Sequence, residues 1–254
     1  MLHDTLNPDR IVDSEAALEF MKEATKLAST TELEDIGERL EHKSQVFAEL
    51  LTEERLDAMT EAELKQLLSW VFSLRRKSSR LLRHNSLHTI RTELKALLYG
   101  GDVVPTRFDR FLDSVGGLDR AMIVSLASEA LHFSDPRRYW LWTHWVWNPG
   151  NGTGALTLVT QDGVDLSAAT DGAIYHKVGQ ATALVNARGH AEGFTRVGRG
   201  LFGTDVFLAC VYAVYMYTVF RVKLSQEFNR ILPELSDLVQ RVLGVHQMGE
   251  VHGR

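Results

Sequence analysis

The chain has 254 residues, of which 44% are hydrophobic, and a formal net charge of −5. A chain of this length can bury a stable core without disulfide cross-links. Its single cysteine, Cys210, excludes an internal disulfide and a cysteine-based zinc cluster. The negative charge argues against a protein that coats nucleic acid indiscriminately. Because no basic segment followed by an apolar one opens the sequence, we expect no secretion signal and a cytoplasmic location.

Acidic residues concentrate in the first quarter of the chain, where apolar residues recur at helical spacing. Residues 1–66 hold 17 acidic residues against 7 lysines and arginines. Each expected helix is preceded by a residue or pair that satisfies the free N–H groups of a first turn. These signals are Asp13 or Ser14 as an N-cap, and Thr31 with Glu34 and Thr60 with Glu63 as capping boxes.

The charge changes sign in residues 75–95, which hold seven lysines and arginines and two histidines against one acid, Glu93. An apolar stripe runs through the second half of this region, so one helix is expected to bury one side and to present cations on another. The cations either pair with the acidic N-terminal helices or form a surface for phosphate. The row of cations is His84, His88, Arg91 and Lys95, and the candidate phosphate contacts are Arg83, His84, Arg91 and Lys95.

Residues 107–147 predict two helices joined by a glycine hairpin. The first helix has apolar residues at positions 108, 111, 112 and 115, and the second has them from position 122 to 133. Between them, Gly116 and Gly117 permit a turn and Asp119 is a suitable N-cap. Asp135 precedes a proline, which favours the end of the second helix at this point.

Four of the five tryptophans follow the second helix. Side chains of this size usually anchor a core or an interface, and the alternative is that they stack on a nucleic-acid base. Both interpretations stay open, because Arg137 and Arg138 stand beside the cluster. The four tryptophans are Trp140, Trp142, Trp145 and Trp147.

The rest of the chain predicts a loop at 148–154, a small β-hairpin and three more helices. The hairpin is expected from residues 155–160 and 164–166 around a Gln-Asp-Gly turn. One helix is expected to end at Gly189, a long one to run from Thr204 to about position 230, and the last to start near Pro233. The apolar run 206–220 is too short to span a bilayer, so we expect no membrane insertion.

These patterns predict an all-α protein, a multi-helix bundle with one helix-hairpin-helix unit and one small β-hairpin insertion. We expect a single helical domain over residues 1–254, with residues 1–148 and 149–254 as possible sub-regions.

Two further motifs match part of a known cofactor-binding or metal-binding pattern, but we expect neither a cofactor nor a metal. The segment 198–203 matches Gly-x-Gly-x-x-Gly, but helix rather than a βαβ unit surrounds it, and Asp205 would repel an anion. Glu129 and His132 have the spacing of half a di-iron site, but a second Glu-x-x-His is absent from the sequence.

Residues 107–147 resemble the helix-hairpin-helix DNA glycosylase superfamily, through the aromatic entry helix, the Val-Gly-Gly-Leu-Asp hairpin and the Thr143-His144 pair. The resemblance implies that backbone amides at Gly116 and Gly117 hold a DNA phosphate. It also implies a catalytic aspartate before the Thr-His pair, where this chain has Trp142. Arg120 approximately matches the position of the lysine that bifunctional members of the family use as nucleophile. A guanidinium cannot replace that lysine because it stays protonated.

Three functional hypotheses follow. The first is a non-catalytic or divergent glycosylase-like protein that binds DNA or RNA through the basic helix face, with the hairpin and Arg120 on a phosphate and with Trp140 and Trp142 stacking or wedging. The second is a non-enzymatic accessory protein that binds a protein partner through its acidic helices and tryptophans. The third is an enzyme on a small anionic ligand at the Gly-Arg loop, residues 196–203. If catalysis exists, Asp135 and His144 are the candidates, although Asp135 also suits a simple turn.

Overall fold

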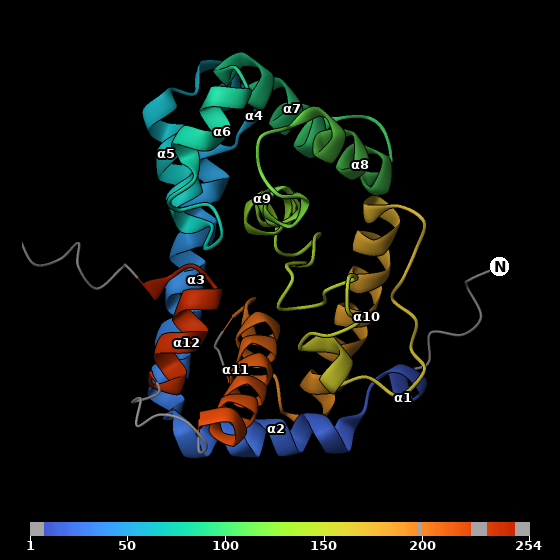
Figure 1. Ribbon diagram of the computed structural model, residues 1–254. Coiled ribbons are helices and arrows are strands. Elements are labelled where there is room, and N and C mark those ends of the chain that lie inside the picture. Colours follow the sequence, from blue (N-terminus) through green and yellow to red (C-terminus); the bar gives the residue numbers. More distant parts are fainter. Residues whose placement is uncertain (1–7, 198–199, 225–232, 247–254) are drawn as a thin grey trace, which may run out of the picture. The chain divides into compact units, whose positions relative to one another are not determined.

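The computed structural model describes residues 8–197, 200–224 and 233–246, and these residues form a helical protein (Figure 1). The all-α prediction is confirmed. Within the described ranges, β-structure is limited to two isolated bridges, Val12 with Thr160 and Asn148 with Thr153. The helices are α1 (Pro8–Ile11), α2 (Ser14–Leu27), α3 (Thr30–Leu50), α4 (Glu53–Ala58), α5 (Glu61–Trp70), α6 (Ser78–His84), α7 (Leu87–Tyr99), α8 (Val104–Ser114), α9 (Arg120–Ser134), the 3-10 turn η1 (Leu156–Leu158), α10 (Asp171–Glu192), α11 (Gly203–Leu224) and α12 (Leu235–Val242).

The predicted β-hairpin at 155–166 does not form. Residues 156–158 make the 3-10 turn, and the backbone beyond them pairs with the N-terminal segment instead of with residues 164–166. The Asp13 amide donates to the Val159 carbonyl at 2.9 Å, and the Gln161 amide donates to the Ile11 carbonyl at 2.9 Å. Because the Val159 carbonyl and the Gln161 amide bond to a segment almost 150 positions away, these backbone groups are not available to form a local hairpin.

The chain divides into two compact units, each assembled from segments that are distant in sequence. Unit 1 takes its described residues from 1–40, 145–164 and 181–254, and unit 2 consists of 41–144 and 165–180. Two of the four divisions fall inside helices, α3 and α10, and the other two fall in the irregular segments at 144/145 and 164/165.

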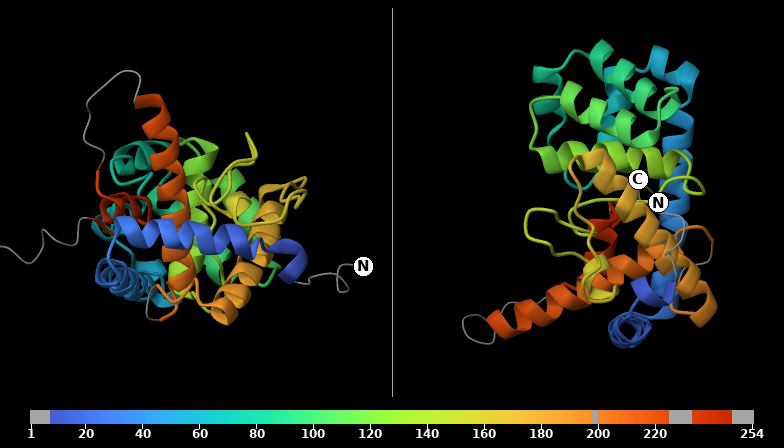
Figure 2. Two further views of the ribbon diagram at one scale, coloured as in Figure 1. Left: turned by 90° about the horizontal axis from the view of Figure 1, so that it is seen from below. Right: turned by 90° about the vertical axis from the view of Figure 1, so that its right-hand side faces the viewer.

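Unit 1 is organised around α11. From Val206 to Val214 this helix is almost entirely buried, and it packs against α2, which it crosses in the left view of Figure 2, and against α12. The predicted burial of the apolar run is therefore correct for its first half, whereas Tyr215 is 36% exposed. Among the described residues, no helix is long and apolar enough to cross a membrane.

Several helix boundaries differ from the predicted ones. The capping box at the start of α3 is made by Ser29 and Glu32, not by Thr31 and Glu34, because the Ser29 amide and hydroxyl both donate to the Glu32 carboxylate. Helix α10 continues past Gly189 and ends before Gly193, whose positive φ of 91° suits the left-handed residue after a helix. The expected extension of α11 over 225–230 lies outside the described residues.

Unit 2 contains α4 to α9 and packs around α9. Every residue of α9 from Ile123 to Phe133 is buried, and α7 and α8 pack against it and against each other. The predicted apolar face of α8 is buried, as are the residues at 123, 126, 127, 130 and 133, and the helix ends at Ser134 before Asp135, as predicted.

A charged pair lies inside this core. The Lys43 ammonium is fully buried and lies 2.7 Å from a Glu129 carboxylate oxygen and 4.1 Å from the centroid of the Phe133 ring. Burial raises the pKa of Glu129, and the positive charges of Lys43 and, less strongly, His132 lower it. The charge on α9 is therefore tolerated because α3 supplies its counter-ion.

We predict that Lys43→Met destabilises the protein by roughly 3–5 kcal/mol, because it leaves an uncompensated carboxylate in the core. The double variant Lys43→Met/Glu129→Met should recover most of that loss, since two apolar side chains replace a desolvated pair. Urea unfolding of the three proteins at pH 7 checks this. A single variant as stable as the wild type would contradict it.

The same variant should acquire a pH dependence. Without Lys43 the pKa of Glu129 rises further, so above the ordinary glutamate pKa of about 4.3 the folded state binds more protons than the unfolded state. The free energy of unfolding of Lys43→Met should therefore fall as the pH rises from 5 to 8, more steeply than that of the wild type. A parallel pH profile for the two proteins would show that Glu129 does not titrate in this way.

Candidate nucleic-acid interface

The basic region 75–95 forms two helices, not the single helix that was predicted. Helix α6 ends at His84 and α7 begins at Leu87, so Arg83 and His84 lie on a different element from Arg91 and Lys95. The break is built from the two residues between the helices. Asn85 leaves the helical conformation and Ser86 caps α7 by accepting a hydrogen bond from the Thr89 amide at 3.0 Å.

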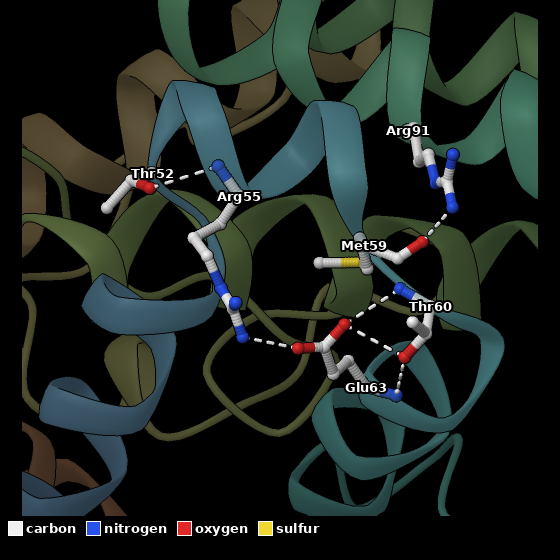
Figure 3. Close-up of polar contacts among 6 residues, drawn as sticks. All are labelled: Thr52, Arg55, Met59, Thr60, Glu63 and Arg91. Carbon is white, nitrogen blue, oxygen red and sulfur yellow. Dashed lines mark hydrogen bonds and ion pairs between the residues drawn. The ribbon is translucent and has the colours of Figure 1, made fainter.

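Arg91 and Lys95 are engaged by α4 and the turn after it. Lys95 lies 2.8 Å from Asp57 and 3.4 Å from Glu53. Figure 3 shows that Arg91 donates to the Met59 carbonyl. For Lys95, the alternative of pairing with the acidic N-terminal residues is therefore the one observed. Both side chains hold α7 to α4, which leaves them poorly suited to bind phosphate.

Figure 3 also shows a local prediction that the structure confirms. Thr60 and Glu63 form the capping box of α5, since the Thr60 amide donates to the Glu63 carboxylate at 2.8 Å and the Glu63 amide donates to the Thr60 hydroxyl. Glu63 also pairs with Arg55. The hydrogen bonds from Thr60 lower the pKa of Glu63, so this acid stays ionised.

Four of the remaining cations of the region, on α6 and on the turn before it, have no carboxylate partner among the described residues. Three of them are exposed and one is half-buried, whereas most lysines elsewhere in the described chain are ion-paired. We call this set the basic segment. It consists of Arg76, Lys77, Arg80 and Arg83.

The glycine hairpin lies against the C-terminal end of α6. The Asn85 side-chain amide donates to the Gly116 carbonyl at 2.9 Å, and its oxygen accepts from the Gly116 amide at 3.0 Å. Gly117 has a φ of 84°, and a Cβ at this position would lie 2.4 Å from the ring of His84. The structure thus brings His84, Gly116 and Gly117 together, but it gives the Gly116 amide a protein partner in place of the expected phosphate.

Arg120 does not have the environment predicted for it. Its guanidinium lies 2.8 Å from Asp113 and 2.8 Å from Asp171, and it also donates to the Leu112 carbonyl. These groups line an open depression of about 330 Å³, in which Asp109 is a third carboxylate. With three acids around one cation, this depression repels a phosphate.

The tryptophans lie mainly in the core, which corrects the predicted stacking role of Trp142. Trp142 is 1% exposed, and its ring centroid lies 5.9 Å from that of Phe108. The backbone amide of Trp142 donates a hydrogen bond to the Ser128 hydroxyl. Trp145 and Trp147 are also buried, and Trp140 is half-buried. The cluster therefore offers little of the exposed apolar surface that docking of a partner protein on the tryptophans requires.

The two catalytic candidates have ordinary surroundings. Asp135 is the C-cap of α9, and its carbonyl accepts from the Arg138 and Tyr139 amides at 3.1 Å, so it is a turn residue. His144 is half-buried, which lowers its pKa, while the charge of Asp171 acts in the opposite direction. Neither residue hydrogen-bonds to the other in the described structure.

The two motif-based sites gain no support from geometry. In the Gly-Arg loop, residues 198 and 199 lie outside the described residues, and Arg196 is exposed. The described residues contain no group of three or more histidine, cysteine or acidic side chains able to hold a metal ion. Glu129 is held by Lys43, and His132 Nδ1 lies 2.8 Å from the Tyr139 carbonyl oxygen.

Two residues escaped the sequence analysis. Phe72 is 41% exposed and lies directly before the basic segment, with the Arg75 guanidinium 5.4 Å from the centroid of its ring. The helix before it, α5, ends at Trp70, so Phe72 lies beyond the apolar face of that helix. Asn85 carried a signal, because an asparagine before a serine favours the end of one helix and the cap of the next.

Comparison with known proteins found no protein-family model that matches the chain, and neither curated proteins nor solved structures gave a significant match.

We predict that Gly117→Ala destabilises the protein by roughly 1–2 kcal/mol from the left-handed backbone alone, with a further loss from displacement of His84. Gly116→Ala is the matched control, because that glycine has no positive φ and a Cβ there meets no atom within 4 Å. Thermal unfolding of both variants checks the prediction. Equal losses at the two positions would contradict the hairpin geometry.

Proposed function

We propose that the chain is a non-catalytic or divergent glycosylase-like protein that binds DNA or RNA, with the basic segment as its main contact surface. The observation that carries the proposal is that Arg76, Lys77, Arg80 and Arg83, three of them exposed and Lys77 half-buried, have no carboxylate partner among the described residues of a chain of net charge −5. A cytoplasmic location, expected from the sequence, belongs to the same proposal.

Electrostatics favours a polyanionic ligand for this segment. Four like charges within eight residues repel one another, and two acids that precede them in the chain are paired with other cations, Glu61 with Lys65 and Glu63 with Arg55. A phosphate backbone supplies closely spaced negative charges, and its binding releases condensed counterions. The basic segment is therefore a surface whose charge is complemented by a polyanion and not by the protein itself.

The hairpin supports this site because it lies against the C-terminal end of α6. Asn85 joins Gly116 to the end of α6, and His84 lies over Gly117, so the hairpin and the basic segment form one continuous part of unit 2. In this proposal Arg83 and His84 face the phosphate, and the hairpin fixes the end of the helix that carries them. Arg91, Lys95, Arg120 and Trp142 are left out, because each is committed to contacts within the protein.

Binding should depend steeply on salt and on the four cations. If all four contact phosphates, the affinity should fall on the order of 50- to 150-fold between 50 and 200 mM salt. Changing Arg76, Lys77, Arg80 and Arg83 together to glutamine should weaken binding strongly and flatten the salt dependence of the binding that remains. Fluorescence anisotropy with labelled DNA and RNA measures both.

The matched control changes Lys22, Lys26, Lys65 and Lys95 to glutamine. It removes the same number of positive charges, but each of these lysines already has an acidic partner. The control should bind like the wild type apart from a small effect of net charge. Equal loss in both variants would show that only net charge matters, and no wild-type binding at 50 mM salt would refute the proposed function.

A further inference from the structure

Phe72 is an exposed aromatic ring placed directly before the basic segment. It is 41% exposed, although large apolar side chains are usually buried, and the buried neighbours Val71 and Leu74 show that the turn around it is packed on the unit. The sequence therefore holds the ring at the surface beside cations.

The surroundings of the ring differ from those of two other aromatic side chains, Tyr99 and Trp70. The Arg75 guanidinium lies 5.4 Å from the Phe72 centroid, and Arg76 and Lys77 come next in the chain. By contrast, the hydroxyl of the exposed Tyr99 donates to the Leu51 carbonyl, and the half-buried Trp70 packs edge-on against His42 at 5.9 Å. Phe72 thus combines a partly exposed ring with a row of cations, the first of which lies over the ring.

This combination points to a strand with unpaired bases. In a duplex the faces of the internal bases are stacked on one another, so cations can reach the phosphates but an aromatic ring beside them has no base face to stack on. In a single strand a base can stack on an aromatic ring while its phosphates lie along neighbouring cations. We infer that the ligand of the basic segment is single-stranded nucleic acid, with one base stacked on Phe72. This inference rests on the proposed function and adds the class of ligand.

The test compares four ligands of equal length: a thymidine 12-mer, a uridine 12-mer, a 12-base-pair DNA duplex, and a 12-mer of abasic deoxyribose phosphates. The abasic strand carries the same backbone charges as the thymidine strand but offers no base. Wild-type protein should bind the thymidine or uridine strand more tightly than the duplex or the abasic strand. The first two ligands also show whether DNA or RNA is preferred.

Phe72→Ala should weaken binding of the single strand by about 5- to 100-fold, the range expected for loss of one stacked base, and should leave duplex and abasic binding unchanged. Phe72→Trp should retain single-strand binding, because it keeps the π surface. Phe72→Leu should behave like Phe72→Ala, since it keeps apolar bulk without a ring. Thermal unfolding should show all three variants folded, as Phe72 is 41% exposed and is not part of the buried core.

The outcomes separate the two proposals. If wild-type protein binds all four ligands equally and Phe72→Ala changes nothing, the stacking inference is wrong and the phosphate surface stands. If Phe72→Ala weakens every ligand alike, Phe72 acts through the structure of the turn and the inference also falls. If wild-type protein binds none of the ligands at low salt, the proposed function fails first.

Discussion

One buried ion pair balances the charge inside the core of unit 2. Helix α9 is enclosed along nearly its whole length, yet it carries Glu129, and the ammonium of Lys43 at 2.7 Å is the main charge that favours its carboxylate. The contact joins α3 to α9 across 86 positions of sequence. Helices α7 and α8 pack on α9, and this packing fixes the positions of the two ends of the hairpin that joins α8 to α9.

The second determinant is the helix break at Asn85. Because the basic region is cut there, its cations are divided between two helices with different neighbours. On α7, Lys95 pairs with acids of α4 and Arg91 donates to the Met59 carbonyl, whereas Arg76, Arg80 and Arg83, on and before α6, are exposed. The candidate interface thus consists of the cations that make no contact with α4 or the turn after it. Asn85, the residue at which the helix breaks, also links the end of α6 to the hairpin by its hydrogen bond to Gly116.

Predictions were most accurate where the interaction is local. The Thr60–Glu63 capping box, the Asp13 cap and the end of α9 before Asp135 each depend on groups within a few residues, and each is found. The Ser29–Glu32 box shows the limit, because overlapping Ser-x-x-Glu and Thr-x-x-Glu patterns compete and packing selects one. The expected strand at 155–160 failed because its backbone partner is the segment at 11–13.

The sequence by itself determined the helical class, most of the helix positions and the location of the positive charge, since periodicity, caps and composition act over a few residues. The tertiary structure alone decided which charges are free, that Trp142 lies in the core, and that Phe72 lies at the surface. The reason is physical. An ion pair or a buried face needs two elements brought together in space, and a single stretch of sequence contains only one of them.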